Sequence, residues 1–155
     1  MKSSIIILFV FAFANSYAQN DYVLKSRDYP IIDVAINGVN AAMIIDTGAD
    51  VNIIDTECAK RFKVDVVPTL GVTIGSSKNF DVHDTKGLLC MVKGRPVTKF
   101  IASNISYVFN PIHERTGIKI SGILGTPAIK ELGMIIDLSR GIVTIKADIG
   151  KWYDR

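Results

Sequence analysis

The residues best suited to chemistry are Asp46, Thr47 and Gly48, which directly follow a run of apolar residues. A carboxylate such as that of Asp46 can take a proton from a water molecule and so prepare the water to attack a carbonyl carbon. The Asp-Thr-Gly triplet is short and also occurs by chance in unrelated chains. Its weight therefore depends on the elements that surround it.

The segment before Asp46 predicts a β-hairpin. Residues 31–36 alternate in hydropathy, Asn37 and Gly38 form a preferred two-residue turn, and residues 39–45 end in four consecutive apolar side chains. Such a continuous apolar stretch indicates a strand that is buried on both faces. We therefore expect Asp46 to emerge directly from the core, with another short strand following at residues 49–54.

A second signature lies late in the chain, at Gly122-Ile123-Leu124-Gly125. It is followed by Thr126, which we predict to be a helix cap, and by Pro127, which suits a first helical turn. Together with the stretch Asp46-Thr47-Gly48-Ala49-Asp50, this segment resembles the retropepsin-like aspartic peptidases. The resemblance covers about residues 31–146 and implies an all-β, closed barrel of short strands and hairpins with one or two short helices.

The resemblance implies that Asp46 is the catalytic residue of an aspartic-type endopeptidase. In such a site, one carboxylate takes a proton from water while a neighbouring carboxylic acid polarises the peptide carbonyl. Two carboxyls about 3 Å apart share one proton and titrate as a pair. Neither Asp-Thr-Gly nor Asp-Ser-Gly recurs in the chain. A second copy must therefore provide the other carboxylate, so we predict a homodimer that acts on peptide or protein.

The resemblance also implies roles for the residues after Asp46. Thr47 ties the two active-site loops together through its hydroxyl, and Gly48, which lacks a Cβ, lets the substrate backbone approach. Ala49 completes the active-site loop, and the carboxylate of Asp50 helps to hold the substrate backbone. For Asp46 itself, the alternative is a solvated aspartate in a turn.

Two further segments have implied roles. Ile123, Leu124 and Gly125 match the strand that passes behind the catalytic loop and supports it by packing, which is also what ordinary core residues do. Gly75, Ser76 and Ser77 lie where the family places the flap that closes over bound peptide, although a plain exposed hairpin is the alternative. The chain departs from many viral members at Thr126, where they have arginine. This departure favours the bacterial or cellular branch of the fold over the viral style of dimer bracing.

The remaining predicted elements are mostly short strands bounded by turn residues, which favours a barrel-like all-β domain. They are a lead-in or edge strand in residues 19–29, a helix at residues 57–62 capped by Asp55 or Thr56, a hairpin around residues 72–82, strands at residues 88–92 and 97–102, a loop at residues 104–117 with a strand at 105–109, a helix from Thr126 that Gly133 stops, and a final hairpin of residues 134–138 and 142–145.

The first 18 residues have the pattern of a secretory signal peptide. Lys2 gives a positive start, residues 5–13 are almost wholly apolar, and Ser16-Tyr17-Ala18 fits a cleavage site. Removal of these 18 from 155 residues leaves 137, residues 19–155, which suits a single domain. No other apolar run approaches the roughly 20 residues that span a bilayer. We therefore expect a secreted or periplasmic product without a membrane span.

Charge and cysteine content restrict the partners. The formal net charge of +3 falls to +2 when Lys2 is removed, which does not suggest nucleic acid. Cys58 and Cys90 could form a disulfide or remain buried thiols. With His83 and His113 they could be arranged as four zinc ligands, but separations of 25, 7 and 23 residues match no usual zinc pattern. No metal and no organic cofactor are expected.

Two other functions fit the same sequence. A retropepsin-like fold can serve as a non-catalytic peptide-binding or assembly module, because a fold does not guarantee an activity. A secreted β-barrel binding protein with a coincidental triplet is the other possibility, and it predicts a stable monomer. The intact Asp46-Thr47-Gly48-Ala49 stretch favours the peptidase.

Overall fold

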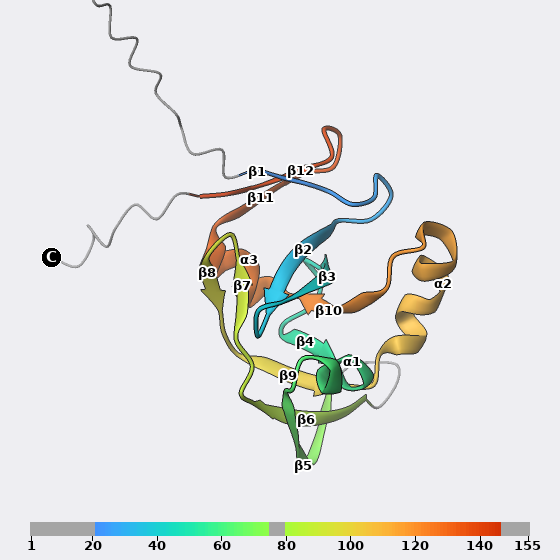
Figure 1. Cartoon of the computed structure of the whole chain (residues 1–155), viewed down its shortest axis with the longest axis vertical. Coiled ribbons are helices and arrows are strands. Elements are labelled where there is room, and N and C mark those ends of the chain that lie inside the picture. The colour runs from blue at the N-terminus through green and yellow to red at the C-terminus, as the bar shows by residue number, and fades with distance from the viewer. Residues whose placement is uncertain (1–20, 75–79, 147–155) are drawn as a thin grey trace, which may run out of the picture.

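The structure is a computed structural model that describes residues 21–74 and 80–146 (Figure 1). Short strands dominate these residues, with three short helices between them. The strands are β1 (Asp21–Val23), β2 (Ile31–Ile36), β3 (Val39–Ile45), β4 (Asn52–Asp55), β5 (Asp65–Ile74), β6 (Phe80–Lys86), β7 (Cys90–Val92), β8 (Arg95–Val97), β9 (Phe100–Ser103), β10 (Ile120–Leu124), β11 (Met134–Asp137) and β12 (Ile142–Ile145). The helices are α1 (Thr56–Arg61), α2 (Ser106–Thr116) and α3 (Thr126–Leu132).

The strands form two sheets. The larger sheet has nine strands in the order β5-β6-β9-β4-β10-β3-β2-β7-β8, and the smaller has the order β1-β12-β11. Within the described residues, the end strands β5 and β8 of the larger sheet are not paired with each other. Strand β10 lies at the centre, parallel to β3 and antiparallel to β4. The predicted all-β fold is confirmed.

The hairpin of β2 and β3 has the predicted bounds and turn. Asn37 and Gly38 both have positive φ angles, 48° and 78°, as a type I′ turn requires. The Asn37 side chain also joins the turn to distant segments, because its amide donates to the carbonyls of Phe62 and Gly87 while its oxygen accepts from the Leu89 amide. The turn that precedes β3 is therefore fixed by contacts with two distant segments.

Helix α2 is the largest departure from the predicted elements. The sequence pattern predicts a loop with a short strand in this region, and that prediction is wrong. Pro111 lies inside the helix, where proline normally ends one, so it obscures the helical pattern. The helix forms because Phe109 and Ile112, three residues apart, share one buried face, and because Gly117 ends it in the left-handed conformation with φ 69°.

Asp55 connects the starts of α1 and α2. Its side chain is buried, with only 1% exposure. One carboxylate oxygen accepts from the amides of Glu57 and Cys58, which confirms Asp55 as the cap of α1. The other accepts from the Ile105 amide and the Ser106 hydroxyl, at 3.1 and 3.0 Å. One carboxylate thus fixes both helices to the end of β4.

Two apolar clusters hold the fold together. The larger includes residues of the nine-stranded sheet and of α1 and α3, such as Ala59 and Leu132. The smaller lies under α2 and joins Phe109 and Ile112 to Ile31, Ala42 and Ile120. In Figure 1, α2 stands at the side of the sheet, away from the small β1-β12-β11 sheet.

Cys58 and Cys90 are both free, buried thiols, so the disulfide left open by the sequence is not formed. Burial raises the pKa of Cys90 to about 12, which keeps this thiol protonated at neutral pH. Among the described residues, none of the helices is both long and apolar enough to cross a membrane.

Candidate active site

Asp46 lies immediately after β3, at the point where the central strands end. Its backbone amide donates to the Leu124 carbonyl of β10 at 3.0 Å, so two parallel strands fix its position. Its side chain is exposed, and one carboxylate oxygen accepts a hydrogen bond of 2.8 Å from the Gly48 amide. The Asp46 carboxylate is thus oriented by its own loop and remains accessible to a bound molecule.

The loop after Asp46 is fixed by residues of the same chain. The Ala49 carbonyl accepts two hydrogen bonds from Thr126, one from the amide at 2.8 Å and one from the hydroxyl at 2.9 Å. Thr126 is therefore not the helix cap that the sequence predicts. Gly125 occupies the cap position of α3, without a side-chain hydrogen bond. The Thr126 hydroxyl instead braces the loop that carries Asp46.

Asn52 is a second brace, which sequence reasoning missed. Its side chain is fully buried. The amide oxygen accepts from the Gly125 amide at 2.9 Å, and the amide nitrogen donates to the Thr98 carbonyl at 2.9 Å. A buried polar side chain with both ends bonded specifies one geometry. The sequence held one signal for this brace: an asparagine that stands among apolar residues, six positions after Asp46.

Glycine allows β10 and the loop beyond it to pass close to the chain after Asp46. A Cβ on Gly125 would collide with the Val51 carbonyl oxygen and lie 2.7 Å from that of Ala49. A Cβ on Gly122 would collide with the Ile53 carbonyl oxygen and lie 2.8 Å from the Met43 methyl carbon. The two glycines of the late signature thus permit the close crossing that supports the loop.

A row of isoleucines crosses the sheet beside this loop. Ile44, two residues before Asp46, is in register with Ile31 on β2 and with Ile123 on β10. The row continues from Ile123 to Ile53 on β4 and Ile101 on β9. Ile31 is fully buried, whereas the other four are partly exposed. Ile44, Ile53 and Ile123 also pack against the apolar cluster under α2. This partly exposed row, which starts beside Asp46, depends on strand register and was not predicted.

The other predicted site residues fall into two groups. Thr47, Gly48 and Asp50 are exposed in the same loop as Asp46, and Ala49 is partly buried under Thr126. The Thr47 hydroxyl makes no hydrogen bond within residues 21–74 and 80–146. Gly75, Ser76 and Ser77, predicted as the flap tip, lie outside the described residues; they fall in the connection between the paired strands β5 and β6.

Comparisons with known proteins agree with this geometry. Residues 32–130 match the family model described as "gag-polyprotein putative aspartyl protease". The chain belongs to this aspartyl protease family. The match spans the β2-β3 hairpin, the Asp46 loop, β10 and most of α3. All the loop contacts described above therefore lie inside the region that defines the family.

Solved structures of aspartic proteases share the fold. EIAV protease in complex with the inhibitor HBY-793 is 23% identical, covers 70% of this chain and 92% of its own, and has a TM-score of 0.52. A retropepsin-like aspartic protease from Rickettsia conorii is 15% identical, with 81% and 89% coverage and a TM-score of 0.53. A search of curated proteins returned no match. The expected resemblance to retropepsin-like proteases is confirmed.

The brace between Thr126 and Ala49 leads to a testable prediction. Thr126→Val keeps the size of the side chain but removes the hydroxyl, so we expect a loss of about 1 kcal/mol in the free energy of unfolding. Peptide cleavage should fall as well, mainly through kcat, because the Asp46 loop loses one of its supports. Thr126→Ser retains the hydroxyl and is the matched control. Equal behaviour of the two variants would contradict the brace.

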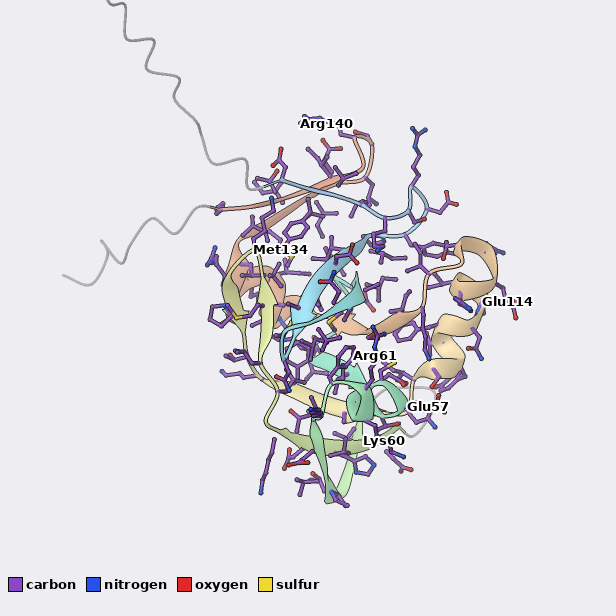
Figure 2. All side chains as sticks on the ribbon, viewed as in Figure 1. Glu57, Lys60, Arg61, Glu114, Met134 and Arg140 are labelled. Atoms are coloured by element: carbon purple, nitrogen blue, oxygen red, sulfur yellow. The ribbon has the colours of Figure 1, made fainter. Side chains whose placement is uncertain are left out.

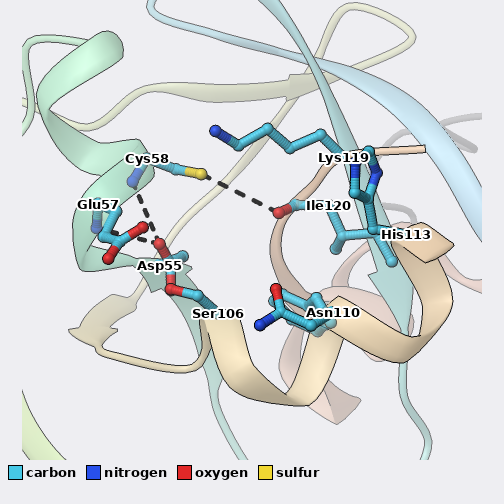
Figure 3. Close-up of a pocket in the computed structure, with 9 residues that line it drawn as sticks. Asp55, Glu57, Cys58, Ser106, Asn110, His113, Lys119 and Ile120 are labelled. Atoms are coloured by element: carbon cyan, nitrogen blue, oxygen red, sulfur yellow. Dashed lines mark hydrogen bonds between the residues drawn. The ribbon is translucent and has the colours of Figure 1, made fainter. Parts of the chain in front are cut away.

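A separate cavity of about 260 Å³ lies between α1 and α2 (Figure 3). It is next to Ile120, at the opposite end of β10 from the Asp46 contact. Cys58 and His113 both line it, yet no three His, Cys, Asp or Glu side chains group as metal ligands in the part of the chain that the structure describes. Burial, and then the negative charge of Asp55, raise the pKa of the Cys58 thiol, which disfavours the reactive thiolate.

Proposed function

We propose that the protein is an aspartic endopeptidase in which two chains each contribute one Asp46. The observation that carries the proposal is the exposed Asp46 carboxylate, which accepts from the Gly48 amide. The Asp46 backbone amide donates to the Leu124 carbonyl, and all three residues lie within the protease family match. A single carboxylate per chain cannot serve as both base and acid, whereas a symmetric pair can. A two-fold symmetric dimer brings the same loop of both chains to one axis.

The reaction needs only water and the two carboxyls. The ionised carboxyl takes a proton from water as the water oxygen bonds to the peptide carbonyl carbon, and the protonated carboxyl donates a hydrogen bond to the carbonyl oxygen. The tetrahedral intermediate then breaks its C–N bond as the carboxyl that took the proton from water gives it to the leaving nitrogen, which restores the pair. One peptide becomes a carboxylic acid and an amine. No metal or organic cofactor takes part in the proposed reaction.

The substrate that fits this site is an extended peptide with apolar side chains next to the scissile bond. Support comes from the partly exposed isoleucines beside Asp46, at positions 44, 53, 101 and 123. Apolar side chains that leave water for this surface gain roughly 25 cal/mol per Å² of buried area. An extended backbone can form strand-like hydrogen bonds, while alternate side chains point to the sheet.

Sedimentation of the purified protein tests the proposal. A peptide that carries a hydroxyl in place of the scissile carbonyl mimics the tetrahedral intermediate and should bind between two chains. We expect this peptide to shift the protein toward a dimer, and an unbiased peptide library to be cleaved at apolar positions. Dimers that bind the mimic without cleaving any peptide would indicate a binding or assembly module, and a strict monomer that ignores the mimic would contradict a shared site.

Export from the cytoplasm is part of the same proposal. It is supported by Lys2, by the apolar residues 5–13 and by the small residues at Ser16-Tyr17-Ala18. When the full chain is produced in cells, the exported protein should start at Gln19 by N-terminal sequencing. A protein that remains in the cytoplasm and retains Met1 would contradict export.

A further inference from the structure

A basic cleft lies at the far end of the central strands from Asp46. It has a volume of about 370 Å³ and is lined by Lys25, Asp33, Asn40, Ala41, Ala42, Arg61, Gly117, Ile118 and Lys119. Three of these side chains are cations and one is an anion. No residue of the Asp46 loop lines it, so this basic cleft is distinct from the candidate active site.

Two of the three cations have no acidic partner among the residues that the structure describes. Lys25 and Asp33 form a salt bridge with N–O distances of 2.7 and 2.9 Å, which neutralises the one carboxylate of the cleft. No salt bridge forms between an acidic side chain and either Arg61 or Lys119 within residues 21–74 and 80–146. The cleft therefore has a local excess of positive charge that favours an anionic ligand.

Arg61 is held in place before any ligand binds. Its guanidinium donates to the Asn40 carbonyl at 3.2 Å and lies over the Phe62 ring, 5.2 Å from the ring centre. One donor is used in this way, and guanidinium has five. Figure 2 shows Arg61 on α1, close to the central strands. A fixed guanidinium with spare donors matches the planar geometry of a carboxylate.

Lys119 lies between the basic cleft and the cavity at α1 and α2, because it lines both. In Figure 3 its side chain extends from the start of β10 toward Cys58 on α1. Its ammonium makes no hydrogen bond to another described residue. It can therefore turn toward an anion in the cleft without breaking a contact of its own.

We infer that the basic cleft binds an acidic segment of the protein substrate. The inference rests on the proposed peptidase function. Ala42 lines the cleft and precedes Asp46 by four residues along an extended strand, so this edge of the cleft is about 13 Å from Asp46. An extended peptide covers at most about 3.3–3.6 Å per residue. The carboxylates must therefore lie at least about four residues from the scissile bond.

Binding is tested apart from cleavage with the Asp46→Asn protein and a fluorescein-labelled oligoglutamate peptide. Fluorescence anisotropy should show binding that weakens as salt screens the charges. Arg61→Glu and Lys119→Glu should each weaken it about tenfold, because charge reversal removes one attraction and adds a repulsion. Lys130→Glu on α3 changes the net charge equally but lies outside the cleft, so it should change the affinity less than about twofold.

The inference would be overturned if all three variants lost affinity for the peptide equally, or if Arg61→Glu and Lys119→Glu left the affinity unchanged. It would also be overturned if inorganic phosphate displaced the peptide at concentrations similar to that of the peptide, which would indicate a small-anion site. Thermal unfolding confirms that each variant is folded. In the active protein, a peptide with acidic residues four or more positions from its cleavage site should have a lower KM than a neutral one. Binding without any cleavage would reject the peptidase function while leaving the anion site in place.

Discussion

The Asp46→Asn variant is expected to lose at least about 10³-fold in kcat for peptide cleavage, because the change removes both carboxyls of a symmetric pair. Asparagine has nearly the same shape, and its side-chain oxygen can still accept the hydrogen bond from the Gly48 amide. Asp46 is also exposed in the single chain. The fold should therefore persist, with an unfolding midpoint close to that of the unchanged protein.

The matched control is Asp65→Asn, which makes the same chemical change at an exposed position at the start of β5. It should leave kcat and KM unchanged. Residual cleavage in Asp46→Asn within about tenfold of the unchanged protein would reject Asp46 as a catalytic residue. The rate should be followed from acidic to neutral pH, so that a shifted optimum is not mistaken for lost activity.

Mixing the unchanged protein with the Asp46→Asn variant tests whether the chains share one site. If subunits exchange freely, equal amounts of the two proteins leave about a quarter of the dimers with both carboxyls. Activity should then be about a quarter of that of the same total concentration of unchanged protein. In a mixture that is unfolded and refolded together, so that the chains exchange, a value near a half would show that each chain acts alone.

Local patterns made part of the fold predictable. The β2-β3 hairpin follows from alternating side chains and from Asn37-Gly38, whose positive φ angles few other residue pairs tolerate. The final hairpin and the stop of α3 at Gly133, with φ 57°, are equally local. Each depends on neighbours in sequence, so it can be inferred without knowledge of the fold.

Other features depend on partners distant in sequence. Helix α2 is fixed by burial of Phe109 and Ile112 and by Asp55, about 50 residues earlier, while Pro111 argues locally against a helix. The isoleucine row needs the register of five strands. Threonine is a common helix cap, yet the Thr126 hydroxyl donates a hydrogen bond to the Ala49 carbonyl, 77 residues away in sequence. Tertiary contacts override local preference in each case.

Gly125→Ala is expected to destabilise the protein strongly. The new Cβ would collide with the Val51 carbonyl oxygen and lie 2.7 Å from that of Ala49. Both are backbone atoms, so no side chain can rotate away to make room. We expect a loss of about 3 kcal/mol or more in the free energy of unfolding, as for severe overpacking.

Gly94→Ala is the matched control, because it adds the same methyl group where no atom lies within 4 Å. Gly94 has φ +75°, so alanine there suffers backbone strain of about 1–2 kcal/mol but no collision. Urea unfolding of the two variants separates strain from collision. We expect the folded fraction of Gly125→Ala to be inactive, because a shift of β10 moves the Leu124 carbonyl that positions Asp46. Cleavage activity in that folded fraction would show that the Asp46 loop does not need the close approach of Gly125 to Val51 and Ala49.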